Sequence, residues 1–135
     1  MSNKLMLTIL SLLVLATGLS AQTAFSVSIP FSFTADDHKF PAGTYAVEAD
    51  RANGVVLLRG ENQDARFMLA NREELSEAPR KSKLVFQRYG SQFVLKAVRG
   101  QGNWEAQSLP TGKIERELAK AEQSQQLIMV QAGSR

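Results

Sequence analysis

A strict alternation of apolar and polar side chains near the amino terminus constrains the fold more than any other feature of this sequence. Between Phe25 and Thr34, every odd position is apolar and every even position is polar or proline. A period of two places the apolar side chains on one face of a β-strand, and that face must then be buried. Pro30 falls on the polar side and cannot donate to a neighbouring strand, so we expect this strand at a sheet edge or with a bulge at Pro30.

Turn signals divide much of the remaining chain into further short strands. Pro41 and Gly43 suit the second and fourth positions of a β-turn after a polar turn at 35–39. Asn53-Gly54 predicts a tight hairpin, because both residues tolerate positive φ. The expected strands are residues 44–50, 55–58, 66–70, 84–89, 92–98 and 127–130. We expect Phe67 and Leu69 to supply the apolar face of the fourth strand in the chain, and the last strand to be buried.

Two segments do not follow the strand pattern. Residues 71–83 are highly charged and contain Pro79, which predicts a loop, with Asn71 and Glu74 at the spacing that caps a short helical turn. Near the carboxyl terminus, Ile114, Leu118 and Ala121 recur at i, i+4 and i+7. This spacing predicts an amphipathic helix of about eleven residues that packs its apolar stripe on the sheet.

Gly112 is the expected N-cap of this helix, because Glu115 follows it at the capping-box spacing and can reach back to the Gly112 backbone N–H. On that basis Gly112→Ser should stabilise the domain slightly, and Gly112→Ala should not. Together these patterns predict an all-β fold. We expect an antiparallel meander of about seven strands, as a sandwich or a partly closed barrel, with one short C-terminal amphipathic helix.

Residues 1–21 have the three parts of a secretory signal peptide. Lys4 supplies the positive charge, Leu5 to Ala16 form an apolar run, and small residues follow up to Ala21. The apolar run is shorter than the ~20 residues of a membrane span, which makes an uncleaved anchor the weaker alternative. We expect cleavage after Ser20 or Ala21, a single β-rich domain over residues 22–135, and export to the periplasm or the medium.

Composition excludes several classes of function. The sequence has no cysteine, which removes disulfides, thiol chemistry and thiolate metal sites. Lys4 is the one charged residue of the signal segment, so residues 22–135 carry 15 basic and 13 acidic side chains. A balance this even, spread along the chain, is not the footprint of a nucleic-acid-binding protein.

Three sequence segments resemble a group of small exported bacterial proteins of unknown function. Residues 29–33 read I-P-F-S-F, residues 41–45 read P-A-G-T-Y, and residues 109–118 read L-P-T-G-K-I-E-R-E-L. The group has motifs similar to I-P-F-x-F, L-P-A-G-x-Y and L-P-x-S-x-x-E-R-E-L, so the likeness spans most of the chain after the signal segment. Phe40 stands where the group has leucine, and Gly112 where it has serine. The resemblance implies no activity and no cofactor.

Candidate catalytic and metal-binding residues are few. His38 is the only histidine and follows Asp36 and Asp37, so these three side chains could bind a divalent cation. A polar turn is the favoured interpretation, because a catalytic zinc needs three spaced ligands. The acidic residues Glu73, Glu74 and Glu77 are expected on a solvated loop. With one histidine and no cysteine, no nucleophile and base pair stands out, and we expect no enzyme, no cofactor and no metal.

Two further groups of residues suggest binding. Arg80, Lys81 and Lys83 could contact an anionic lipid headgroup or an acidic polysaccharide, although a solvated loop balanced by the preceding acids is the favoured interpretation. The aromatic side chains Phe25, Phe31, Phe33 and Tyr45 could line a cavity for an apolar ligand, although a filled core is favoured. The sequence therefore favours an exported, non-enzymatic binding or structural module of the cell envelope. A partner protein or component is unknown, and a small β-barrel carrier of an apolar ligand is the alternative.

Overall fold

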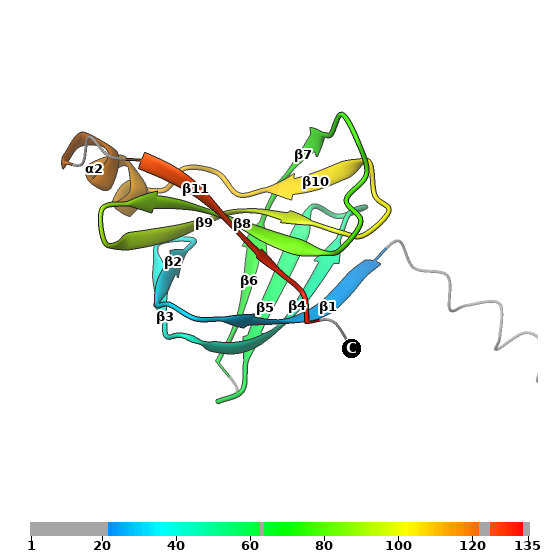
Figure 1. Cartoon of the computed structure of the whole chain (residues 1–135), viewed down its shortest axis with the longest axis horizontal. Helices are drawn as coiled ribbons and strands as arrows, with labels where there is room; N and C mark the ends of the chain where they lie inside the picture. The colour runs from blue at the N-terminus through cyan, green and yellow to red at the C-terminus, as the bar shows by residue number, and fades with distance from the viewer. Residues whose placement is uncertain (1–21, 63, 122–124, 134–135) are drawn as a thin grey trace, which may run out of the picture.

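The computed structural model describes residues 22–62, 64–121 and 125–133, which form two packed β-sheets and one short helix (Figure 1). Sheet A has the spatial order β1 (Gln22–Ile29), β4 (Gly43–Asp50), β5 (Val55–Gly60) and β6 (Ala65–Leu69). Sheet B has the order β11 (Gln125–Gln131), β8 (Lys83–Tyr89), β9 (Gln92–Arg99), β10 (Glu105–Ser108) and β7 (Asn71–Glu74). The helix α2 covers Lys113–Ala121.

This arrangement confirms the predicted all-β class with one short C-terminal helix, and its two open sheets make it a sandwich. The predicted signal segment, residues 1–21, lies outside the described residues. Within those residues, no helix has the length and apolar character needed to span a membrane.

The core lies between the sheets and takes side chains from both. In β4, Tyr45, Val47 and Ala49 are buried and alternate with exposed neighbours, as a half-buried strand requires. From sheet B, Leu84 and Phe86 meet them. The hairpin predicted at Asn53-Gly54 forms between β4 and β5, through a connection of residues 51–54. Gly54 has a φ of 65°, whereas Asn53 does not use the positive φ that the prediction allowed it.

Pro30 divides the expected first strand in two, so the prediction of one continuous strand is wrong. The chain leaves sheet A after Ile29 and enters sheet B at β2 (Phe33–Ala35), which pairs in parallel with β9 through Thr34 and Val94. The alternation survives this change of sheet, because Ile29 and Phe33 both point into the core. Proline cannot continue the hydrogen-bond ladder, and β1 is an edge strand of sheet A, as Pro30 indicated.

A β-hairpin replaces the simple turn expected at 35–39. β2 pairs with β3 (His38–Phe40), and the two-residue connection Asp36-Asp37 has φ values of 51° and 56°. Positive φ at both central residues is the geometry of a type I′ hairpin, which aspartate tolerates better than most residues.

The inward face of β6 is the opposite of the predicted one. Met68 is buried at 2% exposure, whereas Phe67 and Leu69 are 70% and 75% exposed. The register explains this outcome, because Met68 pairs with Val56, whose side chain points into the core. Three consecutive apolar residues leave the face of a strand undetermined, and a partner strand then decides it.

The helical turn expected at Asn71 is also wrong, because residues 71–74 form the edge strand β7. This strand pairs with β10, a strand that the sequence pattern did not reveal. All four side chains of β7 are exposed, so the backbone ladder rather than an apolar face places it in the sheet.

The last strand is likewise an edge strand and is not fully buried. β11 pairs with β8, and its alternate residues Leu127 and Met129 are 58% and 50% exposed. Ile128 and Val130, on the other face, pack against the core. Figure 1 shows the end of β11 (red) descending beside β1 (blue), so the edges of the two sheets approach each other there.

Candidate functional site

The candidate metal site at Asp36, Asp37 and His38 does not assemble. Asp36 Oδ2 accepts a hydrogen bond from Arg66 Nε at 3.2 Å, and the His38 ring packs against Phe40 with centroids 4.8 Å apart. Asp37 points to the helix. Among the described residues, no three potential ligands of these types gather around a common point. The geometry fits the polar-turn interpretation of this segment.

Asp37 caps the amino terminus of α2. Its two carboxylate oxygens accept hydrogen bonds from the backbone N–H groups of Ile114 (3.0 Å) and Lys113 (3.2 Å). These two bonds, that of Ile114 first, lower the pKa of the Asp37 carboxyl below its ordinary value. An acid from the β2–β3 hairpin therefore satisfies the first free N–H groups of a helix that lies far along the chain.

The predicted helix start is correct, but the predicted capping box is wrong. Arg116 N–H donates to Gly112 O at 3.1 Å, which places Gly112 at the N-cap. A Cβ on Gly112 would lie 2.5 Å from Asp37 Oδ1, so a side chain there would displace the cap. The structure therefore favours the opposite expectation, that Gly112→Ser destabilises the domain by displacing the Asp37 cap. Glu115 does not reach back to Gly112, because both of its oxygens have other partners.

Glu115 lies at the centre of a buried polar network on the outer face of sheet B. Its Oε1 is 2.7 Å from Lys96 Nζ, and its Oε2 accepts a 2.7 Å hydrogen bond from the Tyr89 hydroxyl. Lys96 Nζ also donates to Thr111 Oγ1 at 3.2 Å. The side chain of Glu115 is 5% exposed and that of Lys96 is 23% exposed.

A β-bulge brings Lys96 to this position. Val85 pairs with Ala97 and Phe86 with Leu95, so Lys96 is the extra residue of β9 between the two pairs. A bulge interrupts the alternation of side chains along a strand, so it changes the direction in which the side chain of the extra residue points. The sequence contained one indication that Lys96 has a special role, because it interrupts an apolar run. No pattern of neighbouring residues indicated that it contacts Glu115 or lies near Tyr89.

Burial raises the pKa of the Tyr89 hydroxyl, as do the hydrogen bond to the Glu115 carboxylate and the negative charge of that group, and together they bring it to about 12. The hydroxyl therefore stays protonated and donates a hydrogen bond to the Glu115 carboxylate. Both Glu115 oxygens are occupied, and the network joins α2 to β8 and β9. The helix is anchored by these polar contacts, while Ile114 and Leu118 of its predicted apolar stripe are only half-buried.

Of the aromatic side chains considered from the sequence, Phe33 and Tyr45 are buried between the sheets, and Phe25 and Phe31 are partly buried against the core. The Phe33 ring lies 5.3 Å from the ring of Phe40, 5.4 Å from that of Tyr45 and 5.3 Å from that of Phe86. Phe31 stacks on Phe93 at 3.9 Å. These contacts are those of a filled core rather than of the wall of a ligand cavity.

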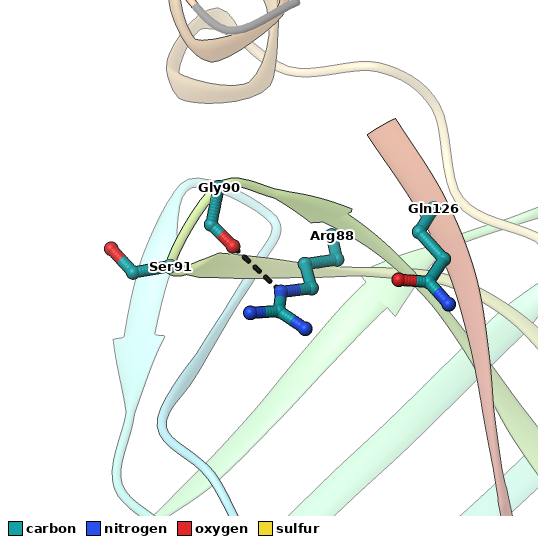
Figure 2. A pocket seen from close by; sticks show the side chains of 4 residues that line it. All are labelled: Arg88, Gly90, Ser91 and Gln126. Atoms are coloured by element: carbon teal, nitrogen blue, oxygen red, sulfur yellow. Dashed lines mark hydrogen bonds between the residues drawn. The ribbon is translucent and has the colours of Figure 1, made fainter. Parts of the chain in front are cut away.

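A small surface pocket lies beside the β8–β9 hairpin, with a volume of about 420 Å³. Figure 2 shows that Arg88 and Gln126 border it from β8 and β11, with Gly90 and Ser91 at the turn. Arg88 Nε donates to Gly90 O at 2.6 Å, and its guanidinium carbon lies 5.6 Å from the centre of the Phe93 ring. The Arg88 side chain therefore stabilises the β8–β9 hairpin.

Apolar side chains gather on the outer face of sheet A, along β5 and β6. Phe67 and Leu69 are strongly exposed, Val55 is partly exposed, and Leu57 is buried at 8% exposure. We call Val55, Leu57, Phe67 and Leu69 the β6 patch. The register places Val55 opposite Leu69 and Leu57 opposite Phe67, so the four side chains form two adjacent cross-strand pairs. Within the described part of the chain, β6 pairs with β5 alone, which makes it an edge strand of sheet A.

The charged candidates lie at different places. Glu73 and Glu74 lie on β7, and these two and Glu77 are exposed, as expected of solvated acids. Arg80 and Lys81 are exposed in the segment that leads into β8. Lys83 begins β8 directly opposite Arg99 of β9.

Comparisons with known proteins give no independent assignment: no protein-family model, curated protein or solved structure matches this chain.

Proposed function

We propose that this chain is an exported, non-enzymatic binding module of the cell envelope, and that it belongs to the group of small exported bacterial proteins that it resembles. The observation that carries the proposal is the β6 patch. Phe67 and Leu69 are 70% and 75% exposed on an edge strand. On the neighbouring strand they lie opposite Leu57, which is buried, and Val55, which is partly exposed. Exposed apolar side chains that lie side by side, as those of Phe67 and Leu69 do, mark interaction surfaces.

The partner is a protein that offers an extended, apolar segment. Such a segment adds to an open sheet edge through backbone hydrogen bonds, while its alternate side chains contact those of the edge strand. Natural proteins commonly protect exposed edges with charged side chains. The one charged residue of β6, Arg66, is held by Asp36, which leaves the apolar outer face of the strand available.

The proposal of a non-enzymatic role is supported by three acidic side chains that make structural contacts. Asp37 caps a helix, Asp36 pairs with Arg66, and Glu115 is held by Lys96 and Tyr89. A general acid or base must reach a proton on its substrate. Each of these three carboxylates would have to leave a structural contact to do so.

The test compares two pairs of exposed apolar residues. The mature protein and its Phe67→Ser/Leu69→Ser variant are each used to capture proteins from envelope extract. The matched control is Leu127→Ser/Met129→Ser, which changes two exposed apolar residues on β11. A captured protein is then purified and its affinity measured. We expect the β6 variant to bind at least tenfold more weakly, since buried apolar contacts at an interface carry about 2 kcal/mol or more, and the control to bind as the wild type does.

Equal binding by both variants would contradict the assignment of the β6 patch. Analytical ultracentrifugation tests whether a second copy of this chain binds the β6 patch instead. A wild-type dimer that the Phe67→Ser/Leu69→Ser variant cannot form would identify the partner as another copy of this chain. Native mass spectrometry of protein from its own host tests the alternative of an apolar-ligand carrier. A stoichiometric bound lipid would support the carrier, whereas the ring-to-ring packing of the core favours an empty protein.

The export proposal has its own test. Expressed in a Gram-negative host, the precursor should leave the cytoplasm and lose about 2 kDa, the mass of a signal peptide of the expected length. Intact-mass measurement of an exported, membrane-bound product that still begins at Met1 would show an uncleaved anchor instead.

A further inference from the structure

A cleft of about 810 Å³ lies where the edges of the two sheets approach each other, beside the end of β11. One wall is the edge strand β1, with Phe25 and Ser26. The opposite wall is the segment before β8, with Arg80, Lys81 and Ser82. Gly133 closes one end, and its backbone N–H lies 3.4 Å from Ser26 O. The volume is within the range of natural ligand pockets.

The lining of this cleft combines positive charge with uncharged donors and one aromatic ring. Gln101 faces the cleft beside Ser82. Ser82 Oγ accepts a hydrogen bond from the Gln101 backbone N–H at 3.0 Å, so its hydroxyl hydrogen can be donated to another group. Phe25 is partly buried against the core and gives the cleft an apolar wall. No acidic side chain is among the lining residues that the structure describes.

The two cations are not neutralised by the acids that precede them in the sequence. Glu73 and Glu74 lie on β7, at the opposite edge of sheet B from β11. Across the described ranges, no carboxylate oxygen lies within 4.0 Å of the charged nitrogens of Arg80 or Lys81. The fold has therefore placed Glu73 and Glu74 on a distant strand, and Arg80 and Lys81 line the cleft without an ion pair among the described residues.

We propose that this cleft binds an acidic saccharide. The planar guanidinium of Arg80 suits a carboxylate, and Lys81 adds a second positive charge. Ser26, Ser82 and Gln101 can hydrogen-bond sugar hydroxyls. A lipid surface fits less well, because polybasic membrane contacts use clusters of about 4–8 Lys and Arg residues, and only two cations line this cleft. The site is separate from the β6 patch and goes beyond the proposed function.

The experiment uses calorimetric titration of the mature protein with a short uronic-acid oligomer, its uncharged methyl ester, and vesicles of anionic phospholipid. Arg80→Gln/Lys81→Gln removes the charge of the cleft. Lys39→Gln/Arg59→Gln is the matched control, because it removes two exposed positive charges from other parts of the surface. The control separates a specific site from an effect of net charge.

A further variant, Gly133→Trp, blocks the cleft without changing its charge. A Cβ at Gly133 meets no atom within 4 Å, so the added side chain does not collide with the fold at its base. Circular dichroism of each variant verifies that it is folded. Phe67→Ser/Leu69→Ser should bind the oligomer as the wild type does, which keeps the failure of this proposal distinct from that of the β6 patch.

We expect the uronic-acid oligomer to bind the wild type and the Lys39→Gln/Arg59→Gln control equally. Affinity should fall roughly tenfold or more in both cleft variants and with the methyl ester, since a charge-assisted hydrogen bond contributes about one order of magnitude in affinity. Equal loss in the control, equal binding of the methyl ester, binding to the vesicles but not to the oligomer, or no binding at all would each overturn the proposal.

Discussion

Replacing Glu115 by alanine tests whether buried polar contacts, rather than an apolar stripe, hold the helix on the sandwich. The substitution leaves the Tyr89 hydroxyl, whose residue is 5% exposed, without its acceptor. An unsatisfied buried donor costs about 1–3 kcal/mol. Removing one member of a fully buried ion pair costs about 3–5 kcal/mol. Lys96 is 23% exposed and keeps Thr111, so its share is smaller.

From these terms we expect Glu115→Ala to lower the free energy of unfolding by about 3 kcal/mol, and Tm by roughly 10–15 °C for a domain of this size. The intrinsic helix preference of alanine offsets this loss by only a few tenths of a kcal/mol. Urea denaturation followed by circular dichroism measures the change. Glu117→Ala is the matched control, because it removes an exposed glutamate from the same helix and should cost less than about 0.5 kcal/mol.

A double-mutant cycle with Lys96→Met isolates the ion pair. If Glu115 and Lys96 interact as their 2.7 Å separation indicates, the double variant should be more stable than the sum of the single effects predicts, by about 1–2 kcal/mol. The reasoning is refuted if Glu115→Ala costs no more than Glu117→Ala, or if the two effects add within about 0.3–0.5 kcal/mol.

Four further predictions concern Tyr89, Gly112, Asp37 and Gly54. Because the pKa of Tyr89 is raised from 10.0 to about 12, stability should fall as the pH rises between these values, and Tyr89→Phe, followed by urea unfolding at each pH, should reduce that fall. Gly112→Ser and Gly112→Ala should both lower Tm in thermal scans, because either Cβ displaces the Asp37 cap; equal or higher midpoints would contradict this. Asp37→Asn should lower Tm at neutral pH. The difference should shrink as the pH falls from 3.8, the ordinary pKa that the carboxyl has in the unfolded chain, through the lower pKa that it has in the folded protein. Gly54→Ala should cost about 1–2 kcal/mol in chemical denaturation, because φ is +65° and the new Cβ would lie 3.0 Å from Ala70 O.

Predictions that depended on neighbouring residues were largely correct. The Asn53-Gly54 hairpin forms with Gly54 at positive φ, and the 84–89 and 92–98 strands are joined by another tight turn. The helix start at Lys113 followed from the spacing of nearby side chains. Each of these features is set within a few residues, so the local sequence contains the information that is needed.

The polar network around Glu115 and the helix cap at Asp37 were the least predictable parts of the structure. Tyr89, Lys96 and Glu115 are separated along the chain, and a bulge in β9 together with the placement of α2 brings them into contact. Asp37 was considered as a metal ligand because its sequence neighbours are Asp36 and His38. In the folded chain its nearest polar partners are instead the N–H groups of a helix more than seventy residues away.

The sequence by itself determined the β class, the main hairpins and the start of the helix, because side-chain periodicity and backbone φ preferences act over a few residues. Only the tertiary structure decided which face of β6 is buried, that residues 71–74 pair with β10, and that Arg80 and Lys81 lie apart from Glu73 and Glu74. The physical reason is the pairing between distant strands. A strand with apolar residues on both faces, or with none, has no preferred orientation of its own, and the register of its partner then fixes which side chains meet water.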